Sequence, residues 1–527
     1  MCGIIFSSKK VEPELIEVNS RRGPDSHQFV SIGNGYLHGF VLNLRNETQI
    51  QPYVVNNHAI AFNGEIYTLN DTENDTTYIG NKLSLVNTND EIIQTISEIN
   101  GEWAMIYYRA DSNYLYFGRD FLGRRSLMWH LPTSEDDCFQ LSSVSDGSHS
   151  VDGYWEEVPT EGIYRVDLDK PFPNDIELFK WNEGVASCLD VTLNSIVLDE
   201  NDMNPVVDCD QFPLQETQLK QDSITSLKET LSEAVRCRVT SIPEIEGNPR
   251  LGILFSGGLD CMVLAALAHS HLPVSEPIDL LNVSFENPRS LKSKSKSPNV
   301  QFDPYSVPDR LTGKLGAEEL QTLYPSRRWN FVEINVPYED AMAKRQHIVD
   351  LMKPLSTVMD LSIAIAFWFA SRGIGHISRD EETVPYKSSA KVLLSGLGAD
   401  EQLGGYSRHR SAYEKRGWQG LVDELSLDVS RISTRNLGRD DRIISDHGKE
   451  VRFPFLDQAV IQLLSSLPVH IKTDPRYIRA LGDKMLLRQV ALTLGLERAA
   501  IEPKRAVQFG ARTAKMELGR QKGHEAL

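Results

Sequence analysis

The chain has 527 residues, which is too long for a single hydrophobic core and predicts two or three domains, with two large ones as the working count. Its 40% hydrophobic and 24% charged residues are typical of an ordinary globular protein and do not fit a disordered chain. A formal net charge of -18 disfavours a general role in binding nucleic acid or anionic membranes, because both partners require concentrated positive charge.

The cysteines and the apolar runs indicate the compartment. The six cysteines show no CxxC spacing of the metal-binding kind, and no apolar signal segment precedes the first of them, so we expect a reducing, cytoplasmic environment. The longest apolar stretch, Leu361 to Ala370, has about half the length of a membrane helix, which needs ~20 residues, and we expect it to be a buried helix. The one basic run, Arg289 to Lys296, alternates with serine, and we interpret it as a solvated loop rather than a docking patch.

Short apolar runs broken by Gly, Pro, Asn and Asp characterise the chain from Cys2 to about Trp181. Such runs predict many strands and few helices. The expected strands are Gly3–Phe6, Tyr53–Val55, His58–Phe62, Trp103–Tyr108, Tyr114–Gly118 and Gly162–Val166, and the expected helix is Asp90–Ile99.

Residues 183–222 form an expected interdomain linker. Nine acidic residues stand against one basic residue, Lys220, between Asn182 and Asp222, and little periodicity holds there. From Ser223 the pattern becomes helical, and apolar runs suited to buried parallel strands then alternate with helical stretches, which predicts an α/β sheet over 223–527. The expected strands of this part are Leu251–Phe255, Leu280–Phe285, Trp329–Val336 and Val392–Leu394.

Cys2 follows the initiator methionine directly and is small enough to permit removal of that methionine. Removal would leave the α-amino group of Cys2 beside its own thiol. An α-amine has an ordinary pKa of ~7.7–8.0, so part of it is a free base near neutral pH and can take the thiol proton. One residue can therefore supply both nucleophile and base.

The motifs that follow Cys2 resemble, in order and spacing, those of class II glutamine amidotransferases. They are Arg22-Gly23-Pro24-Asp25-Ser26, Asn63-Gly64-Glu65-Ile66-Tyr67, Asp90, and Gly118-Arg119-Asp120-Phe121-Leu122-Gly123-Arg124. The resemblance implies an Ntn-hydrolase-type antiparallel αββα sandwich over 2–182, with Cys2 as the nucleophile that hydrolyses glutamine. It assigns the oxyanion hole to the Asn63 side chain and the Gly64 backbone N–H, the α-ammonium of glutamine to Glu65 and Asp90, and a further part in glutamine binding to Asn63.

The residue that binds the α-carboxylate of glutamine is less simply placed. The family has an arginine just after the strand that here spans Tyr36 to Leu44. Leu42 stands at that position in the plainest register, and Arg45 lies three residues on. Because an odd offset on an extended strand reverses the face, Arg45 can substitute only if the chain bends or bulges there.

A second set of motifs lies in the C-terminal part. An apolar strand runs into Ser256-Gly257-Gly258-Leu259-Asp260 before a helical run, the arrangement in which backbone N–H groups and a helix N-terminus bind phosphate. This segment resembles the pyrophosphate loop of ATP pyrophosphatases. Together with the motifs at 395–406 and 450–457 and with Lys484, it resembles the asparagine synthetase family, which implies a parallel-sheet α/β ATP-pyrophosphatase domain.

That resemblance implies two cofactors, ATP and Mg²⁺. The expected ATP-binding residues are Leu254, Ser256, Gly257, Gly258, Asp260, Ser395, Gly396 and Lys484. Asp260 and Asp400 are the expected magnesium ligands, since Mg²⁺ takes one or two carboxylates along with ATP oxygens. Arg452 and Asp457 bracket an apolar segment, and either a structural ion pair or a direct role in the site fits them.

The chain departs from the family at several positions, in a way that resembles the asparagine synthetase domain-containing branch. Leu397 stands where the family has a glutamate thought to handle protons, and leucine has no proton to give or take. Cys261 replaces a serine and Ser126 a proline. A polar segment rich in Ser, Lys and Pro is inserted between Phe285 and Pro308, where we expect disorder.

Three functions remain open at this stage. The first is a two-site enzyme that hydrolyses glutamine at Cys2, passes ammonia internally, and converts ATP-activated aspartate to asparagine with release of AMP and pyrophosphate. The second keeps both sites but amidates another carboxylate. The third is a binding or regulatory protein that has lost synthesis, which Leu397 favours and the intact Ser256–Asp260 loop opposes.

Overall fold

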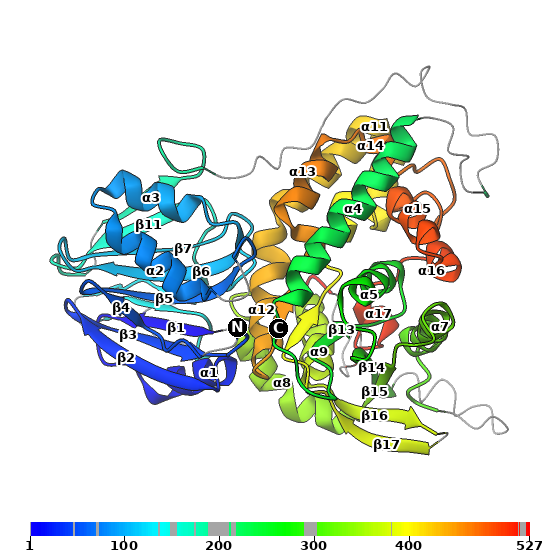
Figure 1. Ribbon diagram of the computed structural model, residues 1–527, viewed down its shortest axis with the longest axis horizontal. Coiled ribbons are helices and arrows are strands. Elements are labelled where there is room, and N and C mark those ends of the chain that lie inside the picture. Colours follow the sequence, from blue (N-terminus) through cyan, green and yellow to red (C-terminus); the bar gives the residue numbers. More distant parts are fainter. Residues whose placement is uncertain are drawn as a thin grey trace.

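The coordinates are a computed structural model that describes residues 2–45, 48–69, 73–134, 137–147, 155–172, 175–187, 210–211, 218–288, 303–380, 382–514, 516 and 523–527. The chain forms two units that lie side by side, one from the N-terminal third and one from the rest (Figure 1). Most of the expected linker and the basic run Arg289 to Lys296 lie outside the described residues. Helix α4 begins at Gln218, inside the segment expected to be linker.

The first unit contains two antiparallel sheets of six strands. One has the order β10-β8-β9-β1-β3-β2 and the other β12-β11-β7-β6-β5-β4. The strands of the first sheet are β1 (Gly3–Ser7), β2 (Ser26–Ile32), β3 (Gly35–Val41), β8 (Met128–His130), β9 (Gln140–Ser142) and β10 (Trp155–Glu157). Those of the second are β4 (Tyr53–Val55), β5 (His58–Ile66), β6 (Gly101–Arg109), β7 (Tyr114–Arg119), β11 (Gly162–Asp167) and β12 (Ile176–Lys180).

The central strands of both sheets are buried on both faces. Because successive side chains of a strand point to opposite faces, residues such as Phe6 and Phe117 meet in a core between the sheets, while Ile60 and Met105 face outward. Helices α2 (Asp75–Leu85) and α3 (Asn89–Ser97) cover that outer face, and α1 (Pro13–Arg22) packs through Leu15 on the other sheet. The expected αββα sandwich is confirmed.

The second unit is built on a seven-stranded sheet of order β17-β16-β15-β14-β13-β18-β19. Its strands are β13 (Leu251–Leu254), β14 (Ile278–Phe285), β15 (Trp329–Val336), β16 (Ile374–Arg379), β17 (Glu382–Lys387), β18 (Val392–Leu394) and β19 (Glu450–Arg452). Neighbouring strands in the run β15-β14-β13-β18-β19 pair in parallel, as expected. The antiparallel hairpin of β16 and β17 at one edge was not foreseen from the sequence.

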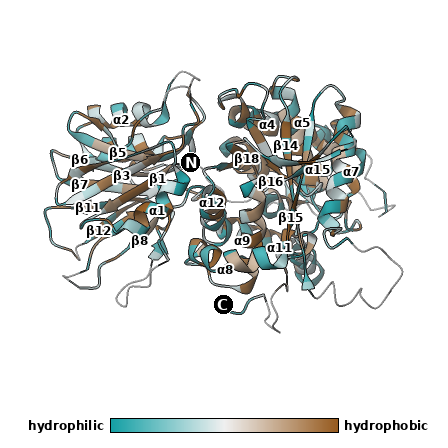
Figure 2. Ribbon diagram, turned by 90° about the horizontal axis from the view of Figure 1, so that it is seen from below, coloured by the Kyte–Doolittle hydropathy of each residue, from teal (hydrophilic) through white to brown (hydrophobic). Residues whose placement is uncertain are grey.

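Helices cover both faces of this sheet, and Figure 2 shows hydrophobic residues concentrated on the central strands and the helices beside them. The longer helices are α4 (Gln218–Thr240), α5 (Leu259–His271), α7 (Pro308–Leu323), α8 (Tyr338–Met352), α9 (Val358–Arg372) and α11 (Ser407–Ser430). The shorter ones are α10 (Ala399–Leu403), α12 (Gly438–Ser445), α13 (Gln458–Ser466), α14 (Val469–Lys472), α15 (Met485–Thr493), α16 (Glu497–Ile501) and α17 (Val507–Gly510), with a π-helix at Ser433–Leu437 and a 3₁₀ turn at Pro454–Leu456. The apolar stretch Leu361 to Ala370 lies in α9, and no helix among the described residues combines the length and apolar character needed to cross a membrane.

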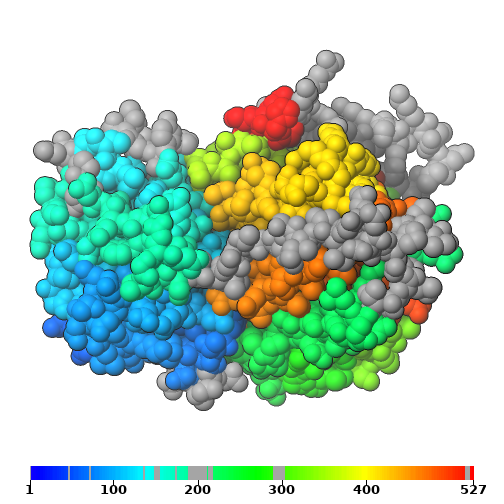
Figure 3. All heavy atoms as spheres, turned by 90° about the horizontal axis from the view of Figure 1, so that it is seen from above, coloured from blue at the N-terminus to red at the C-terminus, as the bar shows by residue number. Residues whose placement is uncertain are grey.

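The two units meet along a contact rich in buried ion pairs, and Figure 3 shows them pressed together. Arg22 of α1 binds Asp441 of α12 at 2.7 Å, and Arg442 binds Glu157 of β10 at 2.7 Å. The backbone N–H of Ser126 donates to Asp441 at 3.1 Å, which a proline at that position could not do. One departure from the family is therefore used in the contact between the units.

Candidate functional site

A small cavity of about 40 Å³ surrounds Cys2 at the junction of the two units. The start of β1 faces the second unit beside α12 (Figures 1 and 2). The cavity is lined by the first unit through Cys2, Val41, Leu42, Asn43, Leu44, Arg45, Gln49, Gln51, Phe62, Gly64, Glu65, Asn74, Asp75 and Thr76, and by the second unit through Glu450.

Asn63 is held in the orientation that an oxyanion donor needs. The backbone N–H of Cys2 donates to Asn63 Oδ1 at 2.9 Å, so the amide nitrogen Nδ2 is the group left over. Asn63 is fully buried, and Nδ2 has no hydrogen-bond partner in the described part of the chain. A buried donor without a partner beside a nucleophile is the arrangement that binds a developing negative charge.

Two further residues shape the environment of the thiol. A Cβ added at Gly64 would come within 2.3 Å of the Glu102 carbonyl oxygen, so only glycine allows β5 and β6 to approach this closely. Gln51, which the sequence reasoning missed, places Nε2 3.6 Å from the Sγ of Cys2 and accepts a hydrogen bond from Phe62 N. Burial raises the pKa of the Cys2 thiol, so a base must take its proton during the reaction.

Arg45 points into the same cavity. Strand β3 ends at Val41, so the extended geometry that would have turned Arg45 to the wrong face no longer applies. Its guanidinium binds both carboxylate oxygens of Asp75 at 3.0 Å and Glu65 at 3.2 Å. Nη1 is buried and has no hydrogen-bond partner among the described residues, which leaves one donor for a ligand carboxylate.

The expected role of Asp90 must be corrected. Asp90 lies exposed in the first turn of α3 and does not line the Cys2 cavity. Asp75 at the start of α2 lines the cavity and accepts a hydrogen bond from Ile66 N at 2.7 Å. Burial and the neighbouring Glu65 raise the pKa of Asp75 to about 7.

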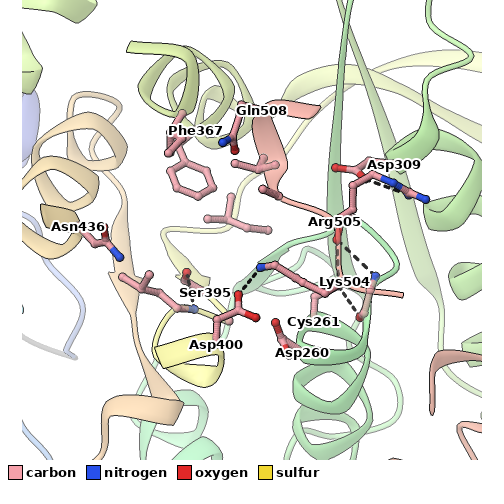
Figure 4. Close-up of a pocket in the computed structure, with 18 of the residues that line it drawn as sticks. Asp260, Cys261, Asp309, Phe367, Ser395, Asp400, Asn436, Lys504, Arg505 and Gln508 are labelled. Atoms are coloured by element: carbon pink, nitrogen blue, oxygen red, sulfur yellow. Dashed lines mark hydrogen bonds and ion pairs between the residues drawn. The ribbon is translucent and has the colours of Figure 1, made fainter. Parts of the chain in front are cut away.

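A larger cavity of about 380 Å³ opens at the carboxyl ends of β13 and β18. Among the residues that line it are Leu254, Ser256, Gly258, Asp260, Ser395, Gly396, Asp400 and Lys484, which the sequence had singled out in three distant segments. Figure 4 shows charged residues such as Asp260, Asp400 and Lys504 at one side of this cavity and Phe367 at another. The cavity thus combines an apolar wall with a strongly polar one.

The glycine-rich turn after β13 has the geometry of a phosphate cradle. Gly257 has a φ of 76°, and a Cβ there would lie 2.3 Å from the carbonyl oxygen of Thr312. Gly258 precedes α5, so the first turn of that helix faces the cavity. Partial positive charge at a helix N-terminus and open N–H groups are suited to phosphate oxygens.

Lys484 connects the two candidate metal ligands. Its Nζ lies 2.7 Å from both oxygens of Asp260 and 2.6 Å from Asp400, and Lys504 also binds Asp400. Lys484 has a left-handed backbone with a φ of 53°, a strained conformation that often marks a functional position. Burial opposes charge on Asp400, but Lys484 and Lys504 outweigh it and hold its pKa well below the ordinary value, so Asp400 is a carboxylate at neutral pH.

These two carboxylates fit Mg²⁺ bound jointly with a nucleotide. No group of three or more His, Cys, Asp or Glu side chains in the described part of the chain could hold a metal alone. Mg²⁺ characteristically uses one or two carboxylates and completes its shell with phosphate oxygens and water. Asp260 and Asp400 in a cavity beside a phosphate-type loop provide that donor set.

Arg452 and Asp457 form ion pairs, as the structural alternative expected, but with other partners. They do not pair with each other, and neither lines the larger cavity. Arg452 binds Glu65 at 3.0 Å and Glu450 at 2.6 Å, while Asp457 binds Arg238 at 2.8 Å. Arg452 therefore joins the two units through Glu65 of the first unit, whereas Asp457 and its partner Arg238 both lie in the second unit.

Leu397 lines the larger cavity, as the family position predicts, without a titratable group of its own. The nearby carboxylate of Glu401 also lines it and accepts hydrogen bonds from Tyr406 Oη at 2.6 Å and Asn436 Nδ2 at 3.2 Å. Burial, with Asp400 adding to it, raises the pKa of Glu401. Asp309, another lining residue that the sequence reasoning missed, has a pKa raised by burial to about 7.

Comparisons with known proteins agree with this arrangement. The asparagine synthase family model matches residues 226–420 and 411–524. Asparagine synthetase domain-containing protein 1 of Mus musculus is 40% identical, over 100% of this chain and 99% of its own. An asparagine synthetase domain-containing protein of Saccharomyces cerevisiae is 35% identical, over 95% of this chain and 89% of its own. The glutamine-hydrolysing asparagine synthetase of Homo sapiens is 23% identical, over 89% of this chain and 76% of its own.

Proposed function

The chain belongs to the asparagine synthase family, within its asparagine synthetase domain-containing protein 1 branch, and from that premise we propose that it is a glutamine-dependent amidotransferase with two active sites. The first site hydrolyses glutamine at Cys2. The second uses ATP to activate a carboxylate, with aspartate as the proposed acceptor. We keep 2–182 and 223–527 as the proposed limits of the two catalytic domains.

In the first site, removal of Met1 exposes the α-amine of Cys2, which takes the thiol proton. The sulfur attacks the amide carbon of glutamine, and Asn63 Nδ2 binds the oxyanion that forms. The α-ammonium of Cys2 returns that proton to the amide nitrogen, which leaves as ammonia, and the resulting thioester is hydrolysed by water to glutamate. Arg45 Nη1 binds the α-carboxylate of glutamine, and Glu65 binds its α-ammonium.

In the second site, the Ser256–Asp260 loop and Lys484 hold the phosphates of ATP. An oxygen of the acceptor carboxylate attacks the α-phosphorus, and pyrophosphate leaves with its charge partly balanced by Lys484. Ammonia then attacks the acyl carbon and AMP leaves, which completes the amide. Mg²⁺ held by Asp260 and Asp400 would neutralise phosphate charge.

The observation that carries the proposal is a pair of hydrogen-bond donors in the Cys2 cavity. Each stands where a group of glutamine would bind, and neither has a partner among the described residues. Asn63 Nδ2 and Arg45 Nη1 are both buried without a partner in the described part of the chain, although leaving a buried donor unpaired costs about 1–3 kcal/mol. Groups with that cost persist where a ligand completes them. A glutamine with its amide at Cys2 and its carboxylate at Arg45 would use both.

The test supplies the purified protein with glutamine, ATP, Mg²⁺ and aspartate and measures glutamate, pyrophosphate and asparagine separately. We expect all three, with pyrophosphate dependent on aspartate. Glutamate without aspartate-dependent pyrophosphate would refute aspartate as acceptor. The variant Cys2→Ala should lose glutamate formation and keep ammonia-driven synthesis, and loss of both would argue against separate sites.

A second candidate function follows from Leu397. An aliphatic side chain lines the cavity at the point where the family has a proton-handling glutamate. A protein that binds ATP and glutamine but has lost amide transfer fits this single position better. Pyrophosphate formed without asparagine in the same assay would support it.

A further inference from the structure

The glutamine pocket contains one residue from the other unit. Glu450 belongs to β19 of the parallel sheet, yet it lines the cavity around Cys2 together with Glu65 and Asp75. It is almost fully buried, with 1% of its surface exposed, so the cavity is what its carboxylate faces rather than bulk water. The pocket is therefore not complete within the first unit.

Arg452 fixes Glu450 beside Glu65. The guanidinium of Arg452 donates from Nε to Glu450 at 2.6 Å and lies 3.0 Å from Glu65 through Nη2. A single rigid fork thus holds two carboxylates on the wall of one cavity. Arg452 itself is anchored by Nη1, which donates to the carbonyl oxygen of Arg238 at 2.7 Å.

The wall of this cavity is rich in acidic side chains. Three carboxylates line the cavity, and the guanidinia in contact with them at 3.2 Å or less are Arg45 and Arg452. Arg125 lies farther from Glu450, at 3.6 Å, and is shared with Glu102 and Asp441. Burial opposes charge on Glu450, but the N-terminal ammonium, followed by Arg452 and Arg125, keeps its pKa below the ordinary value.

Two unpaired donors in the same cavity indicate the rest of the ligand. Asn63 Nδ2 and Arg45 Nη1 are buried without partners among the described residues, and they fit a carbonyl oxygen and a carboxylate. A ligand with a carboxylate, an ammonium and an amide is an α-amino acid amide. Asp90, the expected second acid for the ammonium, does not line the cavity.

We propose that Glu450 of the second unit binds the α-ammonium of glutamine together with Glu65, and that Arg452 positions both carboxylates. This inference rests on the proposed glutaminase function. Glutamine binding then requires the two units to be docked, because the second unit contributes Glu450, one of the two carboxylates that bind the ammonium. Glu450 replaces Asp90 in the role that the sequence had given to that residue.

The test compares two reagents that alkylate Cys2 in the full-length chain, after mass spectrometry has verified Cys2 as the N-terminal residue. Diazo-oxo-norleucine carries the α-amino acid group of glutamine, and iodoacetamide does not. For Glu450→Gln we expect alkylation by diazo-oxo-norleucine to slow at least tenfold, while alkylation by iodoacetamide keeps the wild-type rate. Glu450→Asp retains the charge on a shorter side chain, and we expect an intermediate rate.

Glu157→Gln is the matched control. Glu157 is a buried carboxylate in the same contact between the units, paired with Arg442 and Arg119, but it does not line the cavity. We expect it to be alkylated by both reagents as in the wild type. Unchanged alkylation of Glu450→Gln by diazo-oxo-norleucine, or an equal loss with both reagents, would overturn the assignment.

The wild-type chain separates this inference from the proposed function. If iodoacetamide labels wild-type Cys2 but diazo-oxo-norleucine does not, the cavity is not a glutamine pocket, and the proposed function fails together with the role of Glu450. If both reagents label the wild type and only the Glu450 result is negative, the glutaminase proposal stands and this inference alone is refuted.

Discussion

Asn63→Asp isolates the oxyanion donor from the other contacts of Asn63. The aspartate keeps an oxygen for the Cys2 N–H, which now donates to Asn63 Oδ1 at 2.9 Å, and it has nearly the same shape. It loses Nδ2, the buried amide nitrogen that has no partner among the described residues. Removing one preorganised donor from an oxyanion hole typically lowers kcat by ~10²–10³, or about 2.7–4 kcal/mol of barrier.

The assay is steady-state glutamate formation with glutamine as the varied substrate. We expect kcat to fall by at least about 100-fold, because the new carboxylate also repels the developing negative charge. KM should change little, since Arg45 and Glu65 still bind the α-carboxylate and α-ammonium. A kcat within a few-fold of the wild type, or a loss confined to KM, would refute the role given to Asn63.

Three further predictions concern the second unit. Lys484→Met should reduce ATP-dependent pyrophosphate formation by about 100-fold or more and lower the free energy of unfolding by about 3–5 kcal/mol, because Asp260 loses its buried cation and Asp400 keeps one of two. Leu397→Glu should raise the ratio of asparagine to pyrophosphate, since it restores a group that accepts a proton at the cavity wall. Lys472 is buried, and burial lowers its pKa from 10.5 to about 8. Below pH 8 the folded state is destabilised by the buried ammonium, so Lys472→Met should stabilise the fold there by at most about 3 kcal/mol, at about 1.4 kcal/mol per pKa unit. Loss of the hydrogen bond from Lys472 Nζ to the carbonyl oxygen of Leu464 offsets about 1–3 kcal/mol of this gain. The wild type should gain stability as the pH rises from about 8 toward 10.5, where the unfolded chain binds more protons, and the variant should not.

Each of these outcomes can fail in a recognisable way. Pyrophosphate at the wild-type rate in Lys484→Met would remove that lysine from the site. If the wild type already forms asparagine and pyrophosphate in equal amounts, Leu397 does not impair amide transfer, and Leu397→Glu cannot raise the ratio of the two products. Urea denaturation at several pH values tests Lys472, and identical pH profiles for wild type and Lys472→Met would contradict the prediction.

Much of the fold could be predicted because local patterns dominate it. The runs Trp329–Val336 and Val392–Leu394 are observed as β15 and β18 with the expected bounds. The expected helix at Asp90–Ile99 is observed as Asn89–Ser97, where Thr88 and Glu91 form a capping box. The hairpin of β16 and β17 was missed because its strands are largely exposed and lack a buried apolar run.

The candidate sites were predictable where a motif carries its own geometry. The Ser256–Asp260 turn reaches the expected cavity because strand, glycines and helix are contiguous. The prediction for Asp90 was wrong because the number of residues between Glu65 and Asp90 does not indicate which face of the sandwich α3 covers. Glu450 and Arg452 could not be foreseen as parts of the Cys2 cavity, because no local pattern records that β19 docks there.

The buried ion pairs between the units also affect the order of events while the chain is synthesised. Glu157 and Arg442 are separated by 285 positions along the chain. At a synthesis rate of ~5–20 residues per second, the arginine follows its partner by roughly 15–60 s. During that interval the first unit carries a buried carboxylate that has Arg119 of its own unit but lacks Arg442. Because Glu450 emerges even later, a nascent chain with only the first unit should have no finished glutamine pocket, and hydrolysis of glutamine should await the complete protein.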